Sequence, residues 1–167
     1  LPVAGDRGGT LNVRFFGLTS SREGSVLVRT TTRNLHGRAG LAYPGLSPTE
    51  LFAEPVYVCG LRESKWDRSN LAVQNAGGAE DDEITLRLTV FSGDVANPQS
   101  TVLPDLTLSP GGFHQYSRIL QSNGISLENG YVRVERIAGQ AHYFAYGVIN
   151  DQGTSDGSFV LPVPEKN

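Results

Sequence analysis

Alternation of apolar and polar residues predicts that this chain is built from short β-strands. Every second side chain of residues 84–91 is apolar, which is the period of a strand with one buried face. Residues 11–15 and 131–136 alternate in the same way, and residues 143–149 are almost continuously apolar, as in a strand covered on both faces. No segment sustains a 3.6-residue period, and turn residues recur about every ten residues. The pattern predicts an all-β, antiparallel β-sandwich.

Weaker patterns predict the remaining elements. Further strands are expected at residues 25–32, 41–43, 70–75, 106–108 and 158–162, and residues 113–120 are expected to form a strand or an irregular crossover. Residues 34–40, with two glycines and one arginine, predict a loop between two of these strands. Ser47 followed by Pro48 predicts the N-cap and first position of one helical turn.

Two stretches of the chain resemble each other. Val28 lies 118 residues before Tyr146, and Pro44 lies 118 residues before Pro162. Sandwich units that recur along a chain stabilise one another by stacking. The match predicts the following organisation: a partial β repeat over residues 1–46, a connector with a short strand and a helical turn over 47–66, a complete sandwich repeat over 67–163, and a tail over 164–167.

The partial repeat, taken alone, exposes an apolar face and unpaired strand edges. Two solutions are open. The partial repeat docks on the complete unit of the same chain, or strands from another molecule complete it. Docking within the chain is the favoured solution.

Residues 67–77, in which Arg-Ser-Asn-Leu leads to Asn-Ala-Gly, resemble the opening strand of the Ig-like repeat modules of large secreted and cell-surface bacterial proteins. The order of the later motifs fits the same family: the alternating strand 84–91, Leu-Ser-Pro-Gly-Gly at 108–112, and Gly-Ser-Phe-Val-Leu-Pro at 157–162. The resemblance covers the complete unit and, more weakly, the partial one. It implies an Ig-like sandwich, an extracellular or cell-surface location, a non-catalytic structural or adhesive role and no catalytic residues.

Charge is distributed unevenly along the chain. The net charge is −3, but residues 1–49 hold six arginines against two carboxylates, and residues 50–167 hold eight basic and fifteen acidic residues. Opposite charges steer one molecule toward another. We therefore expect self-association, or packing with neighbouring modules, through Arg14, Arg29 and Arg38 on one side and Asp81, Asp82 and Glu83 on the other. The alternative is that residues 80–83 form a solvated hairpin tip.

Candidate catalytic and metal-binding groups are sparse. The single cysteine, Cys59, lies in an apolar run and is expected to be buried. The three histidines stand singly, without the spacing of metal ligands. The oxygen-rich loop 150–156 lacks the order of a calcium site and is better explained by Asx turns. No nucleophile elbow or phosphate loop is present, so the sequence predicts no enzyme, no metal and no cofactor.

A carbohydrate-binding accessory module of a secreted enzyme is the alternative function. Trp66 lies in a polar connector and is the best candidate for an exposed ring on which a sugar stacks, whereas Tyr143 and Tyr146 are expected in the core. The acidic balance argues against nucleic acid as a partner. No run approaches the roughly 18 apolar residues of a membrane span, so membrane insertion is not expected.

Overall fold

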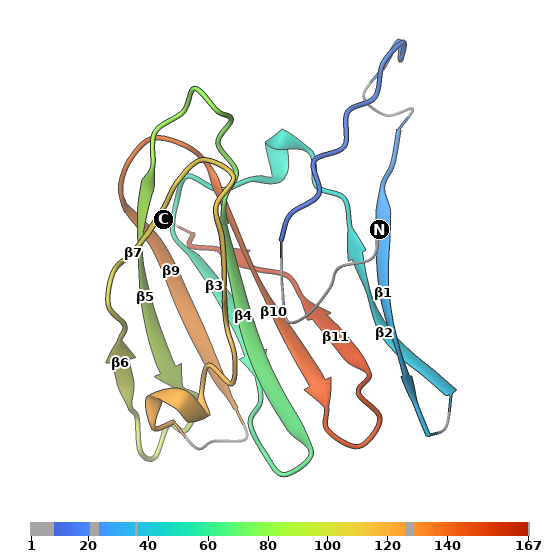
Figure 1. Cartoon of the computed structure of the whole chain (residues 1–167). Coiled ribbons are helices and arrows are strands. Elements are labelled where there is room, and N and C mark those ends of the chain that lie inside the picture. The colour runs from blue at the N-terminus through green and yellow to red at the C-terminus, as the bar shows by residue number, and fades with distance from the viewer. Residues whose placement is uncertain (1–8, 21–23, 36, 126–128, 167) are drawn as a thin grey trace.

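The computed structural model describes residues 9–20, 24–35, 37–125 and 129–166, and in these residues the chain is all-β with antiparallel pairing (Figure 1). One sheet has four strands in the order β11-β10-β4-β8. Its strands are β4 (Asp67–Asn75), β8 (Phe113–Tyr116), β10 (Tyr143–Asp151) and β11 (Gly157–Val160).

The second sheet has the order β12-β3-β9-β5-β6, and β7 also pairs with β5. Its strands are β3 (Val56–Leu61), β5 (Ile84–Ser92), β6 (Ser100–Val102), β7 (Leu106–Leu108), β9 (Gly130–Ala138) and β12 (Val163–Pro164). A separate hairpin consists of β1 (Leu27–Asn34) and β2 (Gly37–Pro44).

The core lies between the two larger sheets, as the alternating patterns predicted. The apolar row of β5 and the facing residues of β9 are fully buried: Ile84, Leu86, Leu88, Val90, Val132 and Val134. From the four-stranded sheet, Leu71, Val73 and Tyr143 reach the same cluster. Burying one large apolar side chain stabilises the folded state by roughly 1.5–3 kcal/mol. These rows are therefore the main stabilising element of the fold. The prediction of an all-β, antiparallel fold is confirmed.

Strand β3 lies inside the six-stranded sheet, between β12 and β9, although the sequence placed it in a connector. Val56, Val58 and Leu61 are fully buried, so this segment contributes to the core of the sandwich. Its register with β9 shifts between Val58 and Leu61, where Gly60 has a φ of +72°. This irregularity interrupts the period-2 pattern and explains why the sequence did not show a full strand.

The strand predicted at residues 11–15 is absent, because these residues have no assigned strand and pair with no described strand. Leu11 is 54% and Phe15 50% exposed. A segment of alternating apolar and polar residues forms a half-buried strand only where the edge of a sheet can pair with its backbone N–H and C=O groups. Within the described part of the chain, no edge does so.

The loop predicted at residues 34–40 is a continuation of the hairpin. Strands β1 and β2 pair up to Asn34 and Gly37, which leaves a two-residue connection. Gly37 has a φ of +138°, and a Cβ at Gly40 would lie 2.1 Å from the carbonyl oxygen of Thr30, so neither position accepts a larger residue. The glycines that suggested a loop are required by a tight, closely paired hairpin.

The predicted helical turn is present as a 3₁₀ turn, η2 (Pro48–Glu50). The Glu50 carboxylate accepts hydrogen bonds from the amide of Ser47 at 2.7 Å and from its hydroxyl at 2.9 Å. These bonds lower the pKa of Glu50. A second 3₁₀ turn, η3 (Gln121–Asn123), follows β8.

Candidate interaction surface

The β1–β2 hairpin lies against the outer face of the four-stranded sheet, beside β11 (Figure 1). One row of β2 makes this contact. Ala39 and Leu41 are buried, and the ring of Tyr43 meets Tyr146 and Phe159 edge-on at centroid distances of 6.0 and 5.6 Å. Edge-to-face rings at this separation attract one another beyond their buried area. The hairpin therefore buries its apolar face on the sandwich of the same chain.

Small and polar groups bring the hairpin close to β11. A Cβ at Gly157 would lie 3.3 Å from Cβ of Leu41, so a larger residue there would push the hairpin outward. The amide of Gly40 also donates to Oδ1 of Asp156 at 3.4 Å. Burial raises the pKa of the Tyr146 hydroxyl to about 12. Tyr146 is thus half-buried at this contact.

Replacing Tyr43 with alanine is expected to undock the hairpin and leave the sandwich folded. Loss of two ring contacts and part of the buried area should cost about 1.5 kcal/mol. Hydrogen exchange measured by mass spectrometry should show faster exchange in 27–44 only. Phe91→Ala, which removes a ring from the other sheet, is the control and should leave exchange in 27–44 unchanged. Uniformly faster exchange in both sheets of Tyr43→Ala would contradict this account.

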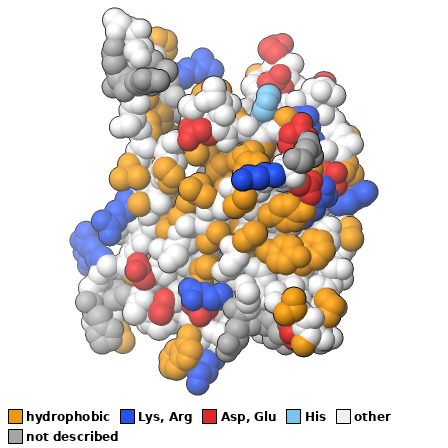
Figure 2. Space-filling view, turned by 180° about the vertical axis from the view of Figure 1, so that it is seen from behind, with side chains coloured by type: hydrophobic (Ala, Val, Ile, Leu, Met, Phe, Trp, Pro, Cys, Tyr) orange, Lys and Arg blue, Asp and Glu red, His pale blue; other side chains and the backbone are white. Residues whose placement is uncertain are grey.

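The opposite face of the hairpin is basic. Arg29, Arg33 and Arg38 are exposed, and Arg33 is paired directly across from Arg38. Like charges placed directly across two strands destabilise the pair. Basic side chains also gather at the left margin in Figure 2, the side on which the hairpin lies when the molecule is viewed from behind. The sequence identified Arg29 and Arg38, but the role of Arg33 required the register.

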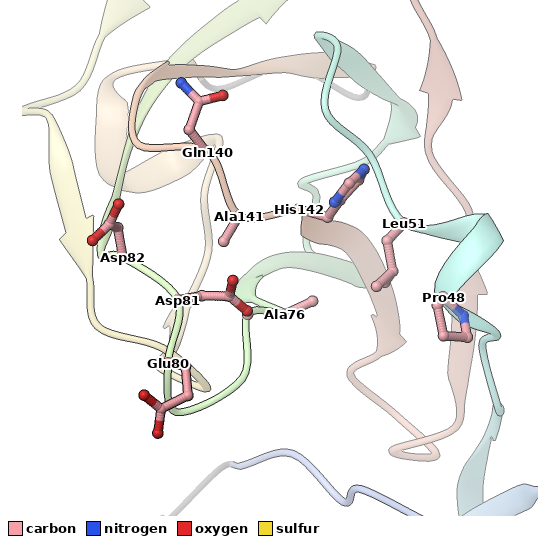
Figure 3. A pocket seen from close by; sticks show the side chains of 10 residues that line it. Pro48, Leu51, Ala76, Glu80, Asp81, Asp82, Gln140, Ala141 and His142 are labelled. Carbon is pink, nitrogen blue, oxygen red and sulfur yellow. The ribbon is translucent and has the colours of Figure 1, made fainter.

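The predicted acidic partners form an exposed turn before β5. Asp81 accepts a hydrogen bond from the amide of Gly78 at 2.6 Å, and Asp82 and Glu83 are exposed. The turn borders an open hollow of about 530 Å³, in which the acidic side chains lie opposite Pro48 (Figure 3). Within the residues described, no ion pair joins this turn to Arg14, Arg29 or Arg38. Among the described residues, the basic face and the acidic turn therefore do not neutralise each other.

A network of polar side chains that the sequence did not reveal ties three loops together at one end of the sandwich. Arg118 donates from Nη1 to Oε1 of Glu63 at 2.9 Å and to Oε1 of Gln121 at 3.3 Å, and from Nη2 to Oε1 of Gln152 at 2.8 Å. Glu63 is only 8% exposed. Arg118 has a φ of +50°, an uncommon backbone conformation for a side-chain-bearing residue.

Trp66 lies beside this network and is 63% exposed. Its amide donates to Oγ of Ser64 at 3.0 Å, and its carbonyl accepts from the amide of Gln152 at 2.7 Å. The Lys65 ammonium lies 5.0 Å from the ring centroid and covers one of its faces. Trp66 is thus exposed, as the sequence suggested, and the carbohydrate-binding alternative stays a prediction.

Aromatic rings also lie on the outer face of the six-stranded sheet, and hydrophobic side chains gather on the rear face seen in Figure 2. Phe91 and Tyr131 stack at a centroid distance of 4.8 Å and an interplanar angle of 10°, and Tyr57 lies 6.2 Å from Tyr131. Arg133 bonds both Glu135 and Glu165 beside them. Because these rings cover one another and the charges are paired, the group does not offer the free flat rings of a sugar platform.

The remaining candidate groups serve turns or lie apart. Oδ1 of Asp151 accepts from the amides of Gly153 and Thr154, an Asx-type turn whose bonds lower the pKa of Asp151. Cys59 is exposed, which corrects the prediction that it is buried, and desolvation raises the pKa of its thiol. His36 lies outside the described residues. Within the described ranges, no group of three or more His, Cys, Asp or Glu side chains is placed to hold a metal ion.

Comparison of the chain with models of protein families, with curated proteins and with solved structures finds no match. In the described part of the chain, no helix has the length and apolar character that a membrane crossing requires.

Proposed function

We propose that this chain is a non-catalytic, Ig-like β-sandwich module that acts by packing against copies of itself or neighbouring sandwich modules. The proposal places it outside the cell, as part of a filament, coat or surface protein. The observation that carries it is the hairpin docked on the outer face of β10 and β11, since the sandwich already uses this face to hold a β-element from outside its own two sheets.

The pairing of the two hairpins supports a repeat of the same unit. The first hairpin is β1–β2, in which Arg29 pairs with Ala42, and the second is β10–β11, in which Gly147 pairs with Val160. Each residue of the second pair lies 118 positions after its counterpart in the first pair, so the two hairpins pair in the same register. The packing of the two copies differs. The buried Leu41 corresponds to Phe159, which lies on the outer face of the second hairpin and not on the face that packs in the sandwich core. The first hairpin therefore buries the face that the second hairpin turns outward. We infer that the partial repeat serves as a contact between units.

Charge supports the choice of partner. The arginines of the hairpin and the acidic turn at 81–83 belong to the same molecule, yet no ion pair joins them among the described residues. Two copies can satisfy both groups by bringing the hairpin of one to the turn of the other. Such a contact is heterologous, and it produces a ring or an open filament depending on the angle between copies.

At low ionic strength the protein is expected to self-associate, and the association should weaken as salt is added because exposed charges are screened. Sedimentation velocity across a concentration and salt series measures this. The double variant Arg29→Glu/Arg38→Glu should be monomeric under the same conditions. Arg68→Glu reverses another exposed arginine of the sandwich and should associate like the parent protein. A parent protein that stays monomeric at high concentration and low salt would refute the proposal.

A further inference from the structure

Within the described part of the chain, the backbone groups on the outer edge of β1 have no strand partner. The amide of Gly45 donates to the carbonyl of Val26 at 2.7 Å, and this bond sets the alternation of the antiparallel ladder that continues into β1 and β2. Even-numbered residues of β1 therefore exchange bonds with β2. The N–H and C=O groups of Leu27, Arg29, Thr31 and Arg33 point the other way.

No described strand other than β2 pairs with β1. In Figure 1, β1 stands at the right margin of the molecule. With eight residues it is one of the longer strands of the structure, and a long, regular, open edge is a template for a further strand.

The side chains beside this edge determine which strand fits. Arg29 and Arg33 share one face of β1, and Arg38 lies across from Arg33 on the same face. A second β1 strand would bring its own arginines to this face, where like charges repel. A strand with carboxylates at alternate positions would instead place one carboxylate beside each arginine of β1.

We propose that the open edge of β1 is a strand-addition site for an extended acidic peptide of a partner chain, which pairs antiparallel with β1. The proposal rests on the proposed function in one respect, namely that these arginines meet acidic groups of another molecule. It differs in the form of the partner. Residues 78–83 form a turn in which Asp81 is bonded to Gly78, whereas the edge takes an extended strand.

A synthetic peptide, acetyl-Thr-Glu-Val-Glu-Val-Glu-Thr-amide, tests the site in the full chain. In an added antiparallel strand, the glutamates lie on the arginine face and their amides point toward β1. N-methylation of the glutamate amides should therefore weaken binding by about tenfold or more, because it removes the ladder bonds, whereas N-methylation of the valine amides should change it by less than about twofold. Titration followed by NMR should first shift the amides of Leu27, Arg29, Thr31 and Arg33.

Thr31→Pro is the matched protein variant. The N–H of Thr31 points to the open edge. Proline at this position therefore removes a donor for the added strand but leaves every hydrogen bond between β1 and β2 in place. The variant should keep the parent unfolding midpoint and lose about tenfold or more in peptide affinity. Arg29→Glu/Arg33→Glu should also lose binding, and Arg29→Lys/Arg33→Lys should retain most of it.

The outcomes separate strand addition from charge alone. Equal binding of the two methylated peptides, with undiminished binding by Thr31→Pro, would show attraction to the arginines without a strand and overturn the inference. Absence of binding by the parent peptide at low salt would overturn it too. Peptide binding by a protein that remains monomeric would support the edge site and refute only the proposed self-association.

Discussion

Replacing Tyr143 with alanine is expected to destabilise the sandwich more than any other single substitution considered for this chain. Tyr143 is fully buried, and its hydroxyl lies 2.8 Å from the carbonyl oxygen of Glu54 and 2.9 Å from that of Val134, two acceptors that share its one proton. The substitution leaves a large cavity and removes the donor from the buried carbonyl of Val134, at a cost of about 4 kcal/mol. Urea unfolding followed by fluorescence measures it, and a loss below about 1.5 kcal/mol would contradict the assigned core position.

Tyr143→Phe isolates the hydroxyl and gives a pH signature. It should cost about 1 kcal/mol at neutral pH, since packing is kept and one hydrogen-bond donor is lost. Burial raises the pKa of Tyr143 well above its usual value of 10.0. The folded state then keeps the phenol neutral while the unfolded chain ionises, so this stabilisation is full below pH 10 and declines above it. The stability difference between the parent and Tyr143→Phe should therefore narrow as the pH rises above 10.

The sandwich core was predictable because its strands are regular and covered on one face. In residues 84–91 the period-2 pattern identified the buried row of β5 from local sequence alone. Residues 11–15 show the same period and form no strand. Alternation specifies which side chains a strand would bury, but the sheet edge that accepts its backbone is set by distant residues.

The candidate surface was predictable in composition and not in geometry. Local charge identified Arg29 and Arg38. Because every second side chain of a strand lies on the same face, Arg29 and Arg33, four residues apart, share one face of β1. The direct opposition of Arg33 and Arg38 depends on the hairpin closing with a two-residue connection. This short connection could not be predicted from the glycines at 37 and 40, because glycines are as typical of a long loop as of a tight hairpin.

The polar network around Arg118 could not be predicted, because its partners come from three separate loops. Glu63, Gln121 and Gln152 carry no pattern that distinguishes them from solvated surface residues. Only the fold places the end of β3, the turn after β8 and the turn after β10 beside one another. The network also orients Trp66, whose carbonyl accepts from the backbone of Gln152.

Arg118→Ala is expected to cost about 2 to 3 kcal/mol of unfolding free energy, because it leaves the buried carboxylate of Glu63 without its cation. The side chain of Glu63 is 5% exposed and that of Arg118 38%, so the cost is lower than for a fully buried pair. Alanine retains a Cβ, so the backbone strain at this position is unchanged. Chemical denaturation of the variant measures the loss.

Burial, and not the ion pair as such, is the cause of this expected loss, and a matched pair on the same molecule tests that point. Arg87 and Asp105 meet at the same 2.9 Å as Arg118 and Glu63, but their side chains are 46% and 39% exposed. Arg87→Ala should therefore lower the unfolding free energy far less than Arg118→Ala does. Adding Glu63→Gln to Arg118→Ala should recover part of the stability, since a neutral amide needs no counter-charge. Equal losses for the two arginine variants would show that the Glu63 site is as well solvated as the surface pair.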